Sequence, residues 1–170
     1  MNKCDWTTKA NLSWKCRFGL LGFSFIIIIL DQITKEVARH NLMLYQVKPF
    51  VQYWSWTLAY NKGAAFSFLA DQSGWQKLFF GLVALIVSIC LVYYILNRSY
   101  SRLSGIALSF ILGGALGNLI DRILYGEVTD FVLWYYRSHS WPAFNVADSF
   151  ITVGITLLII ENVFFGKKNS

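Results

Sequence analysis

Two aspartates in the second half of the sequence have the residue type needed for acid–base chemistry. Asp130 lies in an alternating stretch at 128–132, and Asp148 stands at the start of a long apolar run. Two carboxyl groups held close together do not both ionise, so such a pair shares a proton and activates a water while protonating the carbonyl that the water attacks. This chemistry needs neither a metal nor a covalent nucleophile. From spacing alone, structural roles stay open, including an N-cap role for Asp148.

Other polar residues interrupt or flank the apolar stretches. Asp31 and Lys35 are four residues apart, a spacing at which an ion pair forms readily on a helix. They therefore form a helix-end salt bridge or help to organise a site. Asn118 lies in an apolar stretch and needs a hydrogen-bond partner there, and Asp121-Arg122 follows it. Because polar groups are costly in a bilayer, we expect these side chains to converge on one face of the protein.

Membrane helices must position these polar residues. Hydrophobic residues make up 56% of the 170-residue chain and charged residues 14%, and a bilayer core about 30 Å thick requires roughly 20 apolar residues per helical span. The apolar stretches predict one integral membrane domain over residues 1–170, with transmembrane helices at about 18–36, 77–97, 103–122 and 147–166. Small residues at 113, 114 and 117 favour close packing of the third helix. The first stretch is interpreted as a retained span, because no small residues of a signal-peptide cleavage site follow it.

Basic residues predict the orientation of the chain. They precede the first span, lie between the second and third spans, and follow the fourth. Short loops rich in Lys and Arg stay in the cytoplasm, so both termini are expected there and the aspartates at the outer face. The net charge of +6 is explained by this topology and by attraction to membrane lipids, with no need for a nucleic acid partner. No cysteine falls on the outer side, so no disulfide is expected.

Two outer segments, at about 36–77 and 122–145, are too short to form a separate core and are expected to lie on the membrane face. The stretch 54–60 alternates between apolar and small residues, which predicts a strand with one apolar side. Pro49 indicates an edge position in a sheet. The stretch 128–132 predicts a second, short strand, followed by an aromatic anchor that begins at Trp134.

Five short polar motifs lie between residues 31 and 148. They read Asp31-Gln32-Ile33-Thr34-Lys35, Asn61-Lys62-Gly63-Ala64-Ala65-Phe66, Gly113-Gly114-Ala115-Leu116-Gly117-Asn118-Leu119-Ile120-Asp121-Arg122, Gly126-Glu127-Val128-Thr129-Asp130-Phe131 and Phe144-Asn145-Val146-Ala147-Asp148. In this order, and at these places relative to four spans, the motifs resemble those of the lipoprotein signal peptidases, also called signal peptidase II. That family consists of membrane aspartic proteases that remove signal peptides from bacterial prolipoproteins.

The resemblance implies a membrane all-α fold of four transmembrane helices with a small extracytoplasmic β-cradle, and an aspartic endopeptidase with no cofactor and no metal. It implies that the catalytic pair is Asp130 and Asp148. The supporting or substrate-binding polar residues that it implies are Asp31, Lys35, Asn61, Asn118, Asp121, Arg122 and Asn145. Among these, Arg122 is expected to pair with Asp121 or with a substrate carbonyl.

The resemblance also implies a substrate and a location. The substrate is a prolipoprotein whose cysteine already carries diacylglycerol, and cleavage occurs just before that cysteine. The enzyme would lie in the bacterial inner membrane with its active site at the extracytoplasmic face, where the lipid tails stay in the bilayer while the peptide bond reaches the dyad. We expect a monomer.

Parts of the sequence also suggest three other functions: an ion-coupled transporter, a metal-dependent phosphotransferase and a Ser–Lys protease. An ion-coupled transporter usually has its sites near the membrane midplane between repeated halves, whereas here the acids gather at one surface and no repeat is visible. The acids around Asp130 also resemble a CDP-alcohol phosphotransferase motif, but Trp134 stands where that motif has a metal-binding acid. Zinc is not expected, since the chain has 2 histidines and no HExxH motif. A Ser–Lys protease that uses Ser67 or Ser73 stays open on the sequence alone.

Overall fold

Four long helices make up most of the protein. A computed structural model of the chain describes residues 6–63, 75–137 and 139–165. Within this part of the chain, the helices are α1 (Trp14–Asn41), α2 (Trp75–Asn97), α3 (Arg102–Leu124) and α4 (Val146–Phe165). Each contains a stretch long and apolar enough to cross a bilayer. Together with the small sheet described below, they confirm the predicted fold class.

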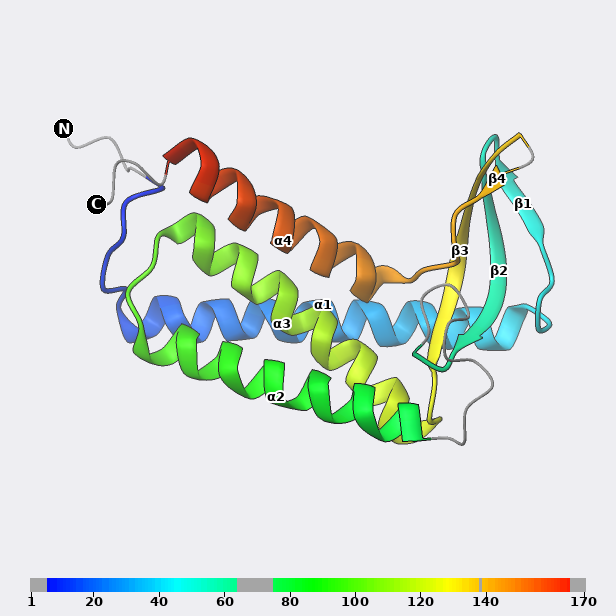
Figure 1. Ribbon diagram of the computed structural model, residues 1–170, viewed down its shortest axis with the longest axis horizontal. Helices are drawn as coiled ribbons and strands as arrows, with labels where there is room; N and C mark the ends of the chain where they lie inside the picture. Colours follow the sequence, from blue (N-terminus) through cyan, green and yellow to red (C-terminus); the bar gives the residue numbers. More distant parts are fainter. Residues whose placement is uncertain (1–5, 64–74, 138, 166–170) are drawn as a thin grey trace.

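Helix α3 forms the centre of the bundle. It contacts α1, α2 and α4, and buried residues occur along most of its length. The other three helices expose large apolar side chains, as expected for surfaces that face lipid rather than water. Helix α1 begins and α4 ends at one end of the bundle, and the sheet stands at the opposite end (Figure 1). The four-stranded sheet therefore lies at one end of the bundle.

Two glycines of α3 allow its neighbours to come very close. A Cβ atom at Gly114 would lie 2.5 Å from the carbonyl oxygen of Ala147 in α4. A Cβ atom at Gly117 would lie 2.6 Å from a carboxylate oxygen of Asp31 in α1. Side chains at either position would push α1 and α4 away from α3, so the predicted close packing of these small residues is confirmed.

The sheet is antiparallel and has four strands in the order β1-β2-β3-β4. The strands are β1 (Lys48–Val51), β2 (Trp54–Asn61), β3 (Val128–Tyr136) and β4 (His139–Ser140). Pro49 lies in β1, the outer strand, which confirms its predicted edge position, because proline lacks the N–H that a central strand must donate. In Figure 1 the sheet stands beside the last turns of α1 and the first turn of α4.

The structure corrects one sequence expectation for the sheet and adds one feature that the sequence leaves open. Strand β3 runs through to Tyr136, so the aromatic residues from Trp134 onward belong to the strand and do not follow it as a separate anchor. In β2, the exposed residues are Trp54 and Trp56, whereas Ser55 and Thr57 are buried. The two indole rings at the start of β2 therefore face outward, whereas Leu58, at the irregularity between Trp56 and Ala59, is buried. A sheet that rests on a membrane exposes its aromatic side chains where lipid and water meet.

The C-terminal end of α1 reaches five residues beyond the predicted span. The helix continues to Asn41, where the N–H of the C-cap Leu42 bonds to the carbonyl of Ala38. Polar residues ended the predicted span at 36, but they do not end the helix. Arg39 contacts the Glu36 carboxylate at 2.7 Å, a pair three residues apart that stabilises a helical turn outside the membrane. This extra turn packs against β3.

The inner end of α1 also begins earlier than predicted, after the N-cap Ser13. Arg17 was assigned to a basic segment before the span, yet it lies inside the helix and is buried. Its guanidinium donates hydrogen bonds to the carbonyl oxygens of Leu12 at 3.0 Å and Arg98 at 2.8 Å. A buried guanidinium needs such partners. Arg17 thereby ties the N-terminal arm to the end of α2.

Candidate active site

The two candidate catalytic aspartates lie on either side of one asparagine. Asp130 in β3 is 3% exposed, and Asp148 is in the first turn of α4. The amide Nδ2 of Asn145 donates a hydrogen bond of 2.7 Å to Asp130 Oδ1. The backbone N–H of the same residue donates one of 3.2 Å to Asp148 Oδ2. Asn145 therefore couples the positions of two carboxyl groups that come from a strand and a helix.

Asn145 and Asp148 form a capping box at the start of α4. The Oδ1 atom of Asn145 accepts a hydrogen bond of 2.9 Å from the backbone N–H of Asp148, while the Asp148 carboxylate accepts the N–H of Asn145. This reciprocal pair satisfies two backbone donors of the helix end. The N-cap role considered for Asp148 is therefore wrong, because Asn145 holds that position.

Asp130 is buried among amide donors. Its Oδ2 atom accepts a hydrogen bond of 3.2 Å from Asn61 Nδ2, and the backbone N–H of Gly63 fixes the orientation of that amide by donating to Asn61 Oδ1 at 2.8 Å. Burial, and after it the negative charge of Asp148, raise the pKa of Asp130 to about 7, against the opposing effect of the hydrogen bonds from Asn61 and Asn145. A carboxyl group with this pKa exchanges a proton readily at neutral pH.

Asn118 connects Lys35 to Asp148. The ammonium of Lys35 is fully buried, contacts the Asp31 carboxylate at 2.7 Å and donates a hydrogen bond of 2.9 Å to Asn118 Oδ1. An ammonium only donates, so the oxygen of the Asn118 amide must face it. The Nδ2 atom then faces the other way and donates to Asp148 Oδ1 at 2.8 Å. The predicted pairing of Asp31 with Lys35 is confirmed, and it lies inside the site.

A family assignment follows from comparison with known proteins. The family model described as "Signal peptidase (SPase) II" matches residues 23–164. A lipoprotein signal peptidase of Teredinibacter turnerae is 46% identical over 148 residues, which cover 86% of this chain and 88% of that protein. The chain belongs to the signal peptidase II family. The resemblance found in the five motifs is thereby confirmed, and the protein is an enzyme, a protease.

Further relatives agree with this family. A lipoprotein signal peptidase of Pseudomonas putida is 48% identical over 160 residues, covering 90% of this chain and 92% of that protein. A solved structure described as "Bacterial membrane enzyme structure by the in meso method at 2.3 A resolution" is 31% identical, has a TM-score of 0.78, and covers 89% of this chain and 92% of that chain. Helices and sheet are therefore arranged here as in a solved bacterial membrane enzyme.

Two further side chains support the site without a role that the resemblance implies: Gln32, which lies within the first motif, and Arg39, which lies outside all five. The Gln32 amide donates hydrogen bonds to Asp31 Oδ2, to Asp121 Oδ1 and to the carbonyl of Gly117, at 3.0–3.2 Å. Arg39 donates one of 2.7 Å to the Thr129 hydroxyl and lies 3.7 Å from Asp121. Arg39 follows Asp31 and Lys35 at intervals of four residues, a spacing that places all three on one helix face.

Arg122 occupies a different position from the one expected for it. It is half-buried, donates a hydrogen bond of 3.3 Å to the carbonyl of Asn118, and lies over the ring of Phe80. Within the described residues it has no ion pair with Asp121, whose carboxylate instead faces Lys35 and Arg39. The expected pairing of Arg122 with Asp121 is therefore absent from the described residues.

Of the alternative functions, the Ser–Lys protease is not tested by the structure, whereas the family decides against the transporter and the phosphotransferase. Ser67 and Ser73 of the Ser–Lys alternative, and residues 64–66 of the second motif, lie outside the described residues. Over 6–63, 75–137 and 139–165, no three His, Cys, Asp or Glu side chains gather in a way that could hold a metal ion. Membership in a protease family is the finding that decides against a transporter and against a phosphotransferase.

Proposed function

We propose that Asp130 and Asp148 are the catalytic dyad with which this bacterial multi-pass membrane protein cleaves prolipoproteins. As a member of the signal peptidase II family, the chain is an endopeptidase that removes their signal peptides. The observation that carries the catalytic assignment is the bridge through Asn145, whose amide and backbone N–H each bind one of the two carboxyl groups. The negative charge of Asp148 also raises the pKa of Asp130, and two carboxyl groups that oppose each other's ionisation hold one proton between them, as aspartic proteases require.

The proposed mechanism assigns different starting states to the two aspartates. Asp130 holds the proton that the pair shares, because its pKa is raised to about 7, which leaves Asp148 to act as the base. Asp148 takes a proton from a water, whose oxygen attacks the scissile carbonyl carbon, while Asp130 donates its proton to the carbonyl oxygen. The tetrahedral intermediate then collapses, the C–N bond breaks, and Asp148 gives its proton to the leaving amine. Asp130 recovers a proton from the hydroxyl of the intermediate.

The supporting residues hold the dyad in place for this reaction. Asn118 and Asn145 donate to the carboxylate of Asp148, and Asn61 donates to that of Asp130. Because each amide is itself fixed by another hydrogen bond, the carboxyl groups need no rearrangement when a substrate arrives. Such preorganisation lowers the barrier of the chemical step. Arg122, with its half-buried guanidinium, is placed to bind a carbonyl of the substrate.

The location of the dyad supports a substrate that is anchored in the membrane. Asp130 lies in the sheet and Asp148 in the first turn of α4, at the end of the bundle where the sheet stands (Figure 1). The basic residues Arg98 and Arg102 flank the opposite end, between α2 and α3. The positive-inside rule then puts both termini in the cytoplasm and the dyad at the extracytoplasmic face. A diacylglyceryl group beside the scissile bond stays in the bilayer in this arrangement.

A cleavage assay on two precursors tests this proposal. The wild-type protein should cleave a prolipoprotein that carries diacylglycerol on its cysteine and leave the unlipidated precursor uncut. Asp130→Asn and Asp148→Asn should both abolish cleavage, whereas Glu127→Gln, an acid substitution in the same segment, should leave it intact. Equal cleavage of both precursors would refute the lipidated substrate. Normal cleavage by folded Asp130→Asn protein would refute the dyad. A monomer remains our prediction, to be checked on the same purified protein by its mass in detergent.

A further inference from the structure

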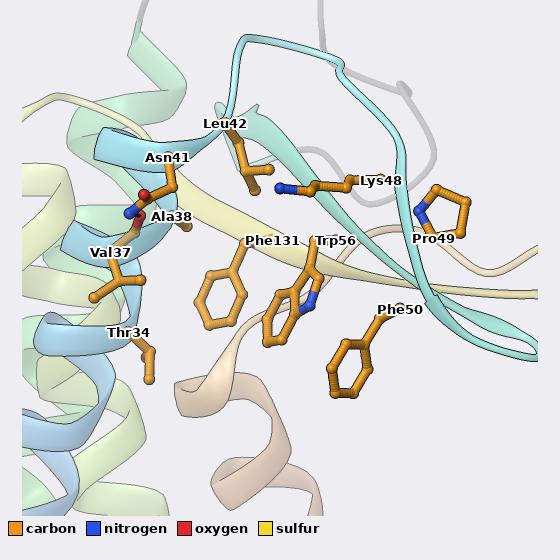
Figure 2. A pocket seen from close by; sticks show the side chains of 10 residues that line it. All are labelled: Thr34, Val37, Ala38, Asn41, Leu42, Lys48, Pro49, Phe50, Trp56 and Phe131. Atoms are coloured by element: carbon orange, nitrogen blue, oxygen red, sulfur yellow. Dashed lines mark hydrogen bonds between the residues drawn. The ribbon is translucent and has the colours of Figure 1, made fainter.

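A cavity of about 360 Å³ lies between the outer end of α1 and the sheet. Phe131 lines it (Figure 2), whereas the preceding residue, Asp130, directs its carboxyl group to Asn61 and Asn145. Successive side chains of a strand point to opposite faces. Strand β3 therefore separates the cavity from the dyad, and the cavity is not part of the candidate active site.

The walls of the cavity are almost entirely apolar. Aromatic rings from the sheet face the last turns of α1 across it, as Figure 2 shows; the main lining side chains are Val37, Ala38, Phe50, Trp56 and Phe131. Trp56 and Phe131 stack with their ring centroids 5.9 Å apart. A smaller cavity of about 250 Å³ shares Phe50 and Trp56 with it. Binding sites for small ligands have this size and lining.

The cavity is continuous with the apolar surface that α1 presents to the membrane. Val37 and Ile33 are exposed on that helix, and Phe50 is exposed on β1. Exposed apolar side chains of this extent mark a surface that binds a membrane or a partner. Since α1 crosses the bilayer and ends beside the cavity, a lipid chain of the outer leaflet reaches the cavity by following the helix. This path to the cavity does not pass through the candidate active site.

One cation lies at the opening of this apolar cavity. Lys48 of β1 extends across the open side toward Leu42, at the end of α1 (Figure 2). Among the described residues, the Lys48 ammonium has no hydrogen bond and no ion pair. Lysine side chains at a membrane surface bury their methylenes against apolar groups and keep the ammonium near the lipid headgroups. The charge therefore complements an anionic headgroup attached to a chain in the cavity.

We propose that this cavity binds an anionic phospholipid, with an acyl chain packed against Trp56 and Phe131 and the headgroup phosphate beside Lys48. The proposed occupant is a lipid of the bilayer and not the diacylglyceryl group of the substrate. In the substrate that group is attached next to the scissile bond, and strand β3 stands between the cavity and Asp130. A bound chain would support the side of β3 that lies opposite the dyad.

Native mass spectrometry of the purified protein in detergent micelles tests the proposal. The protein is mixed with phosphatidylglycerol, which is anionic, or with phosphatidylcholine of the same chain length, which is zwitterionic, and the retained lipid is counted. Lys48→Gln removes the charge and Lys48→Arg keeps it, while Lys9→Gln removes one lysine at the other end of the bundle. Val37→Phe fills the cavity, and Ile33→Phe adds the same ring to α1 outside it.

The wild type should retain phosphatidylglycerol in preference to phosphatidylcholine. Lys48→Gln should weaken that preference about fivefold, the contribution of one lysine near a membrane surface, and Lys48→Arg should restore it. Val37→Phe should lower the retention of both lipids, and the two control variants should behave as wild type. The proposal fails if Lys48→Gln retains as much phosphatidylglycerol as Lys9→Gln. It fails equally if Val37→Phe leaves lipid retention unchanged and raises KM for a lipidated precursor, because the substrate lipid would then occupy the cavity.

Discussion

Asp31 of α1 accepts a hydrogen bond of 2.9 Å from the backbone N–H of Ala147, although 116 positions separate the two residues. Ala147 directly precedes Asp148, so this bond fixes the helical turn that carries one carboxyl group of the proposed dyad. The other carboxyl group has an equivalent support, because Asp121 accepts a hydrogen bond of 2.8 Å from the backbone N–H of Thr129.

One buried ammonium links these two supports. Lys35 lies 2.7 Å from Asp31 and 3.6 Å from Asp121. Two carboxylates and one ammonium leave a net negative charge, which the side chain of Arg39 balances from 3.7 Å away. The charged residues behind the dyad therefore form one connected unit, and a buried charge of this kind is costly to leave without its partner.

Asp31→Asn should destabilise the protein and leave measurable turnover. The substitution keeps an oxygen for the N–H of Ala147 but removes the charge that pairs with Lys35. Loss of one partner from a buried ion pair costs roughly 3–5 kcal/mol, which should appear as a large drop in the unfolding temperature in detergent. Glu36→Gln, which breaks the exposed pair with Arg39, is the control and should change that temperature little. An unchanged unfolding temperature for Asp31→Asn would contradict the structural role.

The sequence predicted the transmembrane helices well, because the thickness of the bilayer sets the length and the apolar composition of each span. It did not predict the sidedness of β2, where Trp54 and Trp56 face outward. An alternating pattern shows that a strand has two different faces, but which face is buried depends on whether lipid, water or protein lies opposite. The C-terminal end of α1 was also predicted too early. Charged residues end a membrane span, but they do not end the helix that contains it.

The sequence predicted residues of the candidate site, but it did not predict the hydrogen bonds between them. Asn145 was included, but its role as the N-cap that also binds Asp130 needs the angle between β3 and α4, which no local pattern encodes. Gln32 belongs to the first motif, but the sequence does not predict its role, because an amide beside a membrane aspartate has many possible partners. Its bonds to α3 depend on the approach that Gly117 permits.

The pH profile of cleavage should report the proton on Asp130. If Asp130 protonates the scissile carbonyl, kcat/KM should fall as the pH rises through about 7, the pKa of this group, with a tenfold loss per pH unit above it. Asn61→Ala removes a hydrogen bond that favours the ionised form, so the pKa should rise and the alkaline limb should move to higher pH. A limb that stays in place, or moves to lower pH, would contradict this assignment of the proton.

Stability should depend on pH through the same residue. The pKa of Asp130 is raised from 3.8 to about 7 in the folded protein, so between these values the folded state holds a proton that the unfolded state has released. Raising the pH across this window therefore destabilises the wild type. Asp130→Asn has no such proton to lose, and its advantage in unfolding temperature over the wild type should grow from about pH 4 to about pH 7. A constant difference across that range would contradict the raised pKa.

The two aspartates should behave as one catalytic unit when both are replaced. Asn at Asp130 or Asp148 keeps the size of the side chain but removes the titrating group, so each single substitution should lower kcat by several orders of magnitude while folding is largely retained. Groups that act together in one step give strongly non-additive losses, because the first substitution already removes the shared proton. The double variant should therefore be scarcely slower than either single variant. Single-turnover cleavage of a lipidated precursor measures these rates, with Glu127→Gln as the control. A double variant whose loss equals the product of the two single losses would show that the aspartates act independently, and the dyad mechanism would be wrong.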